Sequence, residues 1–258
     1  MAQLLGINSQ EELNVSFSFR MTSSFDGKAP DGWGYAFYRG TEWQSFKESL
    51  DMDKILRLDV TTMSSHEFLC KTLMSHMRYA TLGEVTYDNT HPFDRDLFDS
   101  RWFFAHHGHL RLYRHIVDSI EYFKPIGDTD SEVAFCVILE AIRKLGKLPS
   151  DQELAKSINN TAKELAKQGG MNFLLSDGEV MHAFYSRYKS MYYTTLHPPF
   201  EEKIIAESDQ LKIVLNVQDV QSPISIITTD PIIAECDWKE FEIGILYSFK
   251  NGKRIKFV

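Results

Sequence analysis

Cysteine is scarce in this sequence, and the few cysteines lie far apart. Cys70, Cys136 and Cys236 are the only three in 258 residues, an odd number without a CxxC pair. This spacing argues against a disulfide scaffold or a thiolate metal site, and it favours a reducing compartment, the cytoplasm. Long apolar runs are also missing: no stretch approaches the roughly 20 residues that a membrane-spanning helix needs.

Positive charge is thinly spread as well. Acidic residues number 36 and basic residues 28, which gives a net charge of −8, and no run of Lys and Arg stands out. We therefore expect no nucleic-acid partner and no anionic membrane partner. The start of the chain has no basic segment followed by an apolar run, so we also expect no signal peptide.

The chain does have enough apolar material for a packed core. Hydrophobic residues make up 43% of it and aromatic residues 13%, which is typical of a globular protein and not of a disordered one. Strand patterns come first, helix patterns follow, and strand patterns return, without a clean linker or an internal repeat. We expect one α+β domain over residues 1–258, with helices covering sheets. The alternative is two domains divided near Pro149.

Short apolar and alternating segments predict strands in both halves of the chain. They cover residues 4–8, 15–19, 33–38, 172–176, 180–184, 211–217, 224–228, 242–249 and 254–258. Asp177-Gly178 and Asn251-Gly252 are turn signals between neighbouring segments of this set and predict hairpins.

Three helices are predicted from capping boxes, in which Ser or Thr precedes Glu by three residues. The boxes are Ser64 with Glu67, Thr129 with Glu132, and Ser150 with Glu153. A fourth helix, with weaker signals, is expected over residues 112–122.

The first segment that can carry chemistry is the amino terminus. A free α-amine has a pKa of about 8, so it can act as the general base for an N-terminal Cys, Ser or Thr nucleophile. Ala2 is small enough to allow removal of Met1, but its methyl group cannot attack a substrate. Taken alone, Met-Ala is an ordinary start of a protein.

The second and fourth segments carry opposite charges. Arg78 lies where a predicted strand enters a loop, and its guanidinium can hold a carboxylate with two parallel hydrogen bonds. Thr81 adds a hydroxyl in the same loop, although a surface Arg beside a turn is the simpler interpretation. Asp130 lies in the segment Gly127–Glu132, where a carboxylate can complement the positive end of the following helix or bind a substrate ammonium group.

The third segment is an apolar strand, residues 102–110, that runs into histidines and a glycine. Gly108 suits a backbone N–H that points at a developing oxyanion. Seven of the nine histidines lie within residues 66–115, and His107 and His109 would share one strand face. A metal-dependent hydrolase is therefore an alternative. Because no nearby Asp or Glu completes an HxH-plus-carboxylate pattern, we expect core or hydrogen-bonding histidines and neither a metal nor a cofactor.

Together, and in this order, these segments are far more specific than any one of them. The motifs are MxxLLGxN at 1–8, FSF at 17–19, DGWGxxFY at 31–38, HxRxAxxGEVxxxNTHPF at 76–93, WxxAHxGxL at 102–110, GxTDSExAFC at 127–136 and NxLLSDG at 172–178. This pattern resembles the class II (N-terminal nucleophile, or Ntn) glutamine amidotransferases, and within them the stand-alone bacterial YafJ-like group. The resemblance covers most of the chain and implies a four-layer αββα sandwich with two stacked antiparallel sheets.

The resemblance also implies a glutamine pocket at the amino terminus of the chain. Arg78 matches the arginine that holds the substrate α-carboxylate, and Thr81 matches the threonine of the same loop. Asp130 matches the aspartate that binds the α-ammonium group. Gly108 matches the glycine of the oxyanion hole.

Two positions depart from the family pattern. Ala2 stands where the catalytic Cys is expected, and His107 stands where an Asn side chain normally helps to stabilise the oxyanion. A histidine ring N–H can replace that donor, although its reach differs. Removing one oxyanion donor lowers the rate by about 10²–10³, whereas loss of a covalent nucleophile lowers it by as much as about 10⁶. We therefore expect the Ala2 form to be catalytically inactive.

The resemblance implies an amidotransferase or amidohydrolase for L-glutamine or a γ-glutamyl amide. The parent enzyme would form a Cys thioester, release ammonia and hydrolyse the thioester. With no acceptor-processing region after Val258, we expect either a simple amidohydrolase or an enzyme that passes ammonia to a separate partner. A natural, non-catalytic amino-acid-binding module and the metal-dependent hydrolase are the alternatives.

Overall fold

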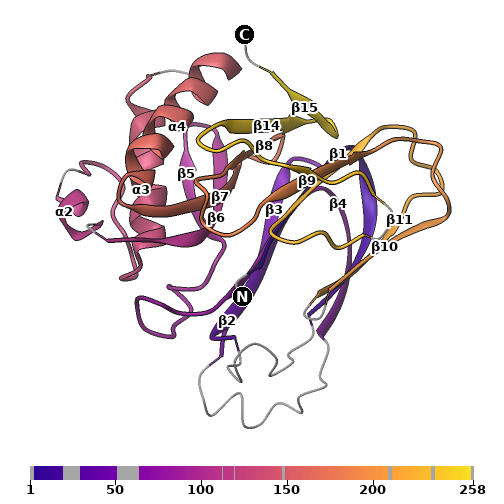
Figure 1. The fold of residues 1–258 in the computed structure, drawn as a ribbon, viewed down its shortest axis with the longest axis horizontal. Helices are drawn as coiled ribbons and strands as arrows, with labels where there is room; N and C mark the ends of the chain where they lie inside the picture. The colour runs from indigo at the N-terminus through magenta and orange to yellow at the C-terminus, as the bar shows by residue number, and fades with distance from the viewer. Residues whose placement is uncertain are drawn as a thin grey trace.

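Two antiparallel sheets lie face to face in the computed structural model, and helices cover the outer face of one of them (Figure 1). The structure describes residues 3–19, 30–50, 64–111, 113–118, 120–146, 149–208, 211–233 and 236–256. Each sheet takes strands from both sides of Pro149. A division at that residue would separate strands that pair within one sheet; the single domain over residues 1–258 stays a prediction. The two-sheet α+β fold agrees with the prediction.

The larger sheet contains nine strands within the described ranges. They are β1 (Gln3–Phe19), β2 (Gly32–Arg39), β3 (Glu42–Ser49), β4 (Ser64–Arg78), β9 (Tyr192–Leu196), β10 (Lys203–Glu207), β11 (Leu211–Asn216), β12 (Ile224–Thr228) and β13 (Lys239–Glu240). The order is β13-β9-β12-β1-β4-β2-β3, with β11 beside the second half of β1 and β10 beside β11. Because β1 and β4 pair along most of their length, they form the centre of the sheet.

The smaller sheet has six strands among the described residues, in the order β15-β14-β8-β7-β6-β5. Their bounds are β5 (Phe93–Leu97), β6 (Ser100–Leu110), β7 (Gly169–Ser176), β8 (Val180–Phe184), β14 (Leu246–Lys250) and β15 (Lys253–Ile255). The helices are α2 (Tyr113–Val117), α3 (Asp130–Arg143) and α4 (Asp151–Ala166). Both α3 and α4 pack on the outer face of this sheet (Figure 1). No helix in the described part of the chain is long and apolar enough to span a membrane.

Alternate residues of a strand face opposite sides of its sheet, and this alternation divides the core into three layers. Between the sheets, Leu4 belongs to the same apolar cluster as Phe103. Their sequence neighbours face outward: Leu5 joins the cluster on the far side of the large sheet, and Phe104 packs against α3. Within the described ranges, helices cover only the outer face of the small sheet.

Two of the predicted helix starts are confirmed. At α4 the Ser150 hydroxyl accepts a hydrogen bond from Glu153 N, and the Glu153 carboxylate accepts one from Ser150 N, so the full capping box forms. At α3 the Thr129 hydroxyl accepts from Glu132 N, as predicted. The Glu132 carboxylate, however, forms an ion pair with Arg95 instead of completing the box.

The helix predicted from Ser64 and Glu67 is wrong, because this segment is the first part of β4. The Glu67 carboxylate accepts a hydrogen bond from the Ser16 hydroxyl across the strand pair, and it caps no helix. Both faces of the strand carry buried side chains, with Leu73 and Met74 in different apolar clusters. Pairing with both β1 and β2 outweighs the local capping signal.

Two other predicted elements are shorter in the structure. The helix expected over residues 112–122 is limited to Tyr113–Val117, and beyond it Tyr122 N donates a hydrogen bond to the Glu140 carboxylate of α3. The strand expected over residues 242–249 begins only at Leu246, after a turn in which Gly244 has a φ of +73°.

Replacing Phe135 with Ala is expected to lower the free energy of unfolding by about 3–5 kcal/mol. Phe135 is fully buried, and its ring is stacked on that of Phe104 at a centroid distance of 5.2 Å. Urea unfolding followed by circular dichroism measures the change. Leu145→Ala is the control: Leu145 is 42% exposed just beyond the same helix and should change stability by no more than about 0.5 kcal/mol. Equal losses in the two variants would contradict this packing.

Candidate functional site

A cavity of about 170 Å³ lies where the ends of β4 and β6 meet the start of α3. Arg78 from β4, His107 and Gly108 from β6, and Asp130 from α3 all line it, and so does Thr81 from the loop after β4. The structure therefore brings five of the predicted residues together in one cavity, although they come from three separate parts of the chain.

Ala2, the remaining predicted position, lies outside the described residues. The next residue, Gln3, is the first of β1 and pairs with Met77 of β4. Since Met77 directly precedes Arg78, the described start of the chain is at the same edge of the large sheet as the cavity.

Arg78 is buried at the end of β4, and its guanidinium faces the loop that follows. One terminal nitrogen donates hydrogen bonds to Leu82 O at 2.9 Å and Gly83 O at 3.3 Å, and the other donates to Glu84 O at 3.2 Å. Burial lowers the pKa of Arg78, while nearby carboxylates, Asp31 foremost, raise it. A guanidinium keeps its charge under these conditions, so Arg78 supplies a fixed positive charge.

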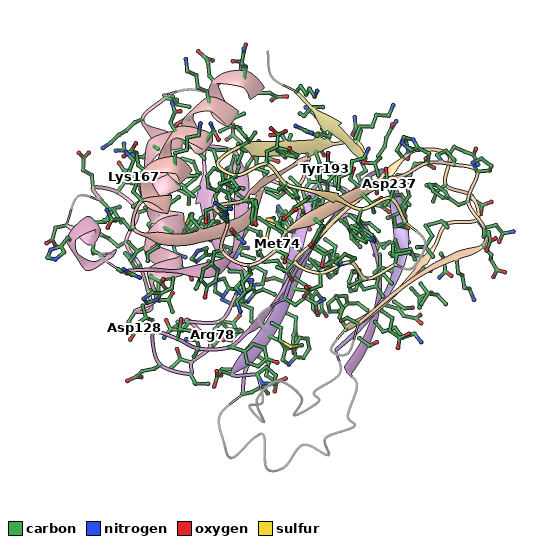
Figure 2. All side chains as sticks on the ribbon, viewed as in Figure 1. Met74, Arg78, Asp128, Lys167, Tyr193 and Asp237 are labelled. Carbon is green, nitrogen blue, oxygen red and sulfur yellow. The ribbon has the colours of Figure 1, made fainter. Side chains whose placement is uncertain are left out.

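The loop after Arg78 is tied to the start of α3 through Asn89. The Asn89 side chain donates to Glu84 O at 3.0 Å and to the Asp128 carboxylate at 2.6 Å, and it accepts from Asp128 N at 3.0 Å. Gly83 fits between these groups with a φ of +76°, and a Cβ there would lie 2.8 Å from the Asp128 carboxylate. Figure 2 shows Arg78 and Asp128 near each other at this edge of the molecule.

Asp130 is the first residue of α3, and its carboxylate is held against the end of β6. One carboxylate oxygen accepts a hydrogen bond from Leu110 N at 2.6 Å and lies 3.8 Å from Nδ1 of His109. The positive end of the helix dipole also favours a negative charge at this position. Asp130 is only 4% exposed, so its charge faces the cavity region and not bulk water.

Gly108 lies where β6 and β7 come very close. A Cβ at this position would be 2.0 Å from Gly170 O and 2.4 Å from Nε2 of His106, so no other residue fits without moving backbone. His106 itself bonds to Ser131 Oγ at 2.9 Å and to Gly170 O at 3.0 Å. Because a carbonyl can only accept, Nε2 of His106 carries the proton, and the Ser131 hydroxyl donates to Nδ1.

His107 is buried in the cavity wall, and its ring meets that of Tyr188 edge-on at a centroid distance of 5.5 Å. Its Nδ1 has no hydrogen-bond partner among the described residues. Burial lowers the pKa of His107 to about 3. The ring is therefore neutral at physiological pH and has one N–H to donate.

His76 and His91 also lie in the cavity wall, and their rings pack against each other. Their ring centroids are 4.2 Å apart, and none of their ring nitrogens has a hydrogen-bond partner in the described part of the chain. Burial lowers the pKa of both rings well below the usual value. No group of three or more His, Cys, Asp or Glu side chains within the described ranges is placed to hold a metal ion.

Ten of the residues that line the cavity were not predicted to belong to the site, and among them are His76, His91, Tyr188 and Lys189. The two histidines fall inside the motif over residues 76–93 that also contains Arg78, and this shared motif is a signal that could have singled them out. Tyr188 and Lys189 lie in an irregular connection between β8 and β9, where Lys189 has a φ of +65°. No periodicity or motif points to these two residues.

Comparison with known proteins identifies the family. The whole chain, residues 1–258, matches the family model described as "Glutamine amidotransferases class-II". This chain belongs to the class II glutamine amidotransferases.

Relatives of this amidotransferase come from bacteria and archaea. A Haemophilus influenzae protein, provisionally named a glutamine amidotransferase, is 32% identical over 99% of this chain and 86% of its own length. The Escherichia coli K12 protein YafJ, also provisionally named a glutamine amidotransferase, is 30% identical over 99% of this chain and all of its own length. An uncharacterised Methanocaldococcus jannaschii protein is 33% identical over 99% of this chain and 71% of its own.

Solved structures agree with this assignment. A predicted glutamine amidotransferase from Pseudomonas aeruginosa superposes with a TM-score of 0.83 at 27% identity, covering 98% of this amidotransferase and 99% of that chain. The glutamine phosphoribosylpyrophosphate amidotransferase of B. subtilis, at 16% identity, has a TM-score of 0.58 and covers 99% of this chain and 49% of its own. The second likeness shows a shared fold.

Stability of this amidotransferase is expected to fall as the pH is lowered from about 6.5 towards about 3. Burial lowers the pKa of His107 from 6.5 to about 3, so between these values the unfolded state binds the proton and the folded state does not. Replacing His107 with Asn removes one such group and should reduce the pH slope of the unfolding free energy by up to about 1.4 kcal/mol per pH unit.

Urea unfolding at a series of pH values measures this slope. His197→Asn, at an exposed position, controls for the substitution itself. An unchanged slope in the His107→Asn variant would mean that His107 takes up its proton equally well in the folded state.

Proposed function

We propose that this cavity binds free L-glutamine or a γ-glutamyl amide by its two charged ends. The observation that carries the proposal is the placement of Arg78 and Asp130, one positive and one negative group, in the wall of the same cavity. An α-amino acid presents a carboxylate and an ammonium group on one carbon, so it complements such a pair. Thr81 adds a hydroxyl beside Arg78 for a further hydrogen bond to the carboxylate.

The amide of the bound molecule would extend toward Gly108 and His107. The backbone N–H of Gly108 and the neutral ring N–H of His107 are suited to stabilise negative charge on the amide oxygen. In the parent reaction a Cys thiolate at position 2 attacks the amide carbon and ammonia leaves with a proton. Water then hydrolyses the thioester to glutamate and frees the thiol. The ammonia passes either to solvent or to a separate enzyme.

Ala2 removes the group that would attack, so we propose that this chain binds its substrate without turnover. The second candidate function is a natural binding module that senses or carries an amino acid. The observation that favours this second function is His107, which lies in the cavity wall. His107 is a second departure from the family pattern, after Ala2, and it falls in the oxyanion region. A protein that only binds an amino acid needs neither the nucleophile nor the usual oxyanion donor. Nothing in the described ranges favours the metal-dependent hydrolase.

Glutamine is expected to bind the Ala2 protein in isothermal titration calorimetry. Arg78→Lys loses the planar fork that holds a carboxylate, and Asp130→Asn loses the charge that attracts an ammonium group. Each should weaken binding by about tenfold or more. Arg39→Lys and Asp219→Asn, at exposed positions away from the cavity, make the same replacements as controls.

Circular dichroism and the unfolding midpoint verify that the variants fold, since Asp130 also bonds to Leu110 N. Binding that is unchanged in both cavity variants would refute the pocket. A titration with acetate and with methylamine in place of glutamine tells whether one charged end suffices.

Replacing Ala2 with Cys is expected to generate ammonia release from glutamine, because it supplies the missing nucleophile. The gain should approach the roughly 10⁶-fold effect of a covalent nucleophile, reduced by any mismatch of His107 as an oxyanion donor. A coupled glutamate dehydrogenase assay measures the ammonia, and mass spectrometry verifies that Met1 has been removed. Adding His107→Asn to Ala2→Cys tests the second departure. Glutamine binding without any turnover in both variants would instead favour the binding module.

A further inference from the structure

A second cavity, of about 640 Å³, lies at the opposite end of β6 from the glutamine pocket. Ser100 at the start of β6 lines it, whereas Gly108 at the end of β6 lines the first cavity. Eight residues of extended strand separate the two positions by about 26 Å. The second cavity is therefore a separate site, formed by the β2–β3, β5–β6 and β7–β8 turns.

One of the residues that line this cavity is a tyrosine whose hydroxyl is open to a ligand. Tyr38 is only 9% exposed, yet no hydrogen bond to its hydroxyl is found among the described residues. Gly178 leaves room for the Tyr38 ring, because a Cβ at this position would lie 2.5 Å from it. Trp43 packs against the same ring at a centroid distance of 5.5 Å, and its indole nitrogen is also buried without a partner in the described ranges.

Acidic residues line the same cavity. Glu42, Asp96, Asp99 and Asp177 line the cavity from its three turns, and the only basic lining residue in the described ranges is Arg101. The positive charge of Arg101 is already neutralised by a residue that does not line the cavity, because its guanidinium pairs with the Asp94 carboxylate. Burial raises the pKa of Asp177 and so disfavours its ionised carboxylate. A positive charge bound beside Asp177 would stabilise that carboxylate.

Aromatic rings complete the lining. Trp43 and the 41% exposed Phe98 offer apolar faces beside the carboxylates. An ammonium group is attracted both by carboxylates and by the faces of aromatic rings. A methylene chain would in turn cover the rings and exclude water from them.

We propose that this cavity binds an aliphatic polyamine. Its ammonium groups would meet the carboxylates of separate turns, and one N–H would donate to the Tyr38 hydroxyl. Carboxylates that approach from three turns favour a chain with spaced charges over a single ammonium group. They also favour it over one divalent metal ion, for which no suitable cluster exists in the described part of the chain.

Titration calorimetry with spermidine at low ionic strength tests the proposal on the full chain. The expected dissociation constant is below about 1 mM. Tyr38→Phe keeps the ring and removes only the hydroxyl, so it should weaken binding by about fivefold. The double variant Asp96→Asn/Asp99→Asn removes two exposed charges and should weaken it by about tenfold or more.

Asp219→Asn and Asp237→Asn, combined, change the net charge of the chain equally at positions outside the cavity. Spermidine affinity retained in this control and lost in the cavity variants supports the proposal. The proposal would be overturned if spermidine did not bind, or if the control variant lost as much affinity as the cavity variants. It would also be overturned if n-butylamine bound as tightly as spermidine, or if Mg²⁺ bound more tightly. Glutamine affinity should stay unchanged in every variant, which separates this site from the first cavity.

Discussion

Packing between the two sheets is the constraint on which the rest of the molecule depends. Leu4 and Met74 of the large sheet and Phe103 and Leu174 of the small sheet belong to one buried apolar cluster. Because these side chains fix how the sheets face each other, the strand ends of one sheet meet those of the other. Arg78 and Gly108 belong to different sheets, and only this packing puts both into the wall of one cavity.

Electrostatics in the first cavity is simple because most of its ionisable rings are uncharged. Burial lowers the pKa of His76, His91 and His107 so far that they are neutral near pH 7. Two strong charges then remain from the predicted set, Arg78 and Asp130. Lys189 adds a further positive charge to the same wall, so the proposed ligand would meet two positive groups and one negative group among neutral donors and acceptors.

The sequence predicted which residues meet in this cavity better than it predicted some of the secondary structure. Motif spacing identified Arg78 and Asp130 because charged residues in fixed order carry information that does not depend on strand or helix. The Ser64–Glu67 capping box failed because hydrogen bonds to two neighbouring strands outweigh one local cap. Tyr188 was missed because its role depends on Gly170, whose missing side chain leaves room for the ring, and this contact is visible only in three dimensions.

The hydrogen bonds of Arg78 have a consequence for recognition. Three backbone carbonyls of residues 82–84 already hold the guanidinium before any ligand arrives. A free arginine side chain has about 2 kcal/mol of rotamer entropy to lose on immobilisation; here folding has removed most of that freedom in advance. For the amino acid that we propose as ligand, affinity would then depend little on side-chain rearrangement and strongly on stereochemistry. The mirror-image amino acid could align one charged end with this rigid anchor, but its side chain would leave in the wrong direction.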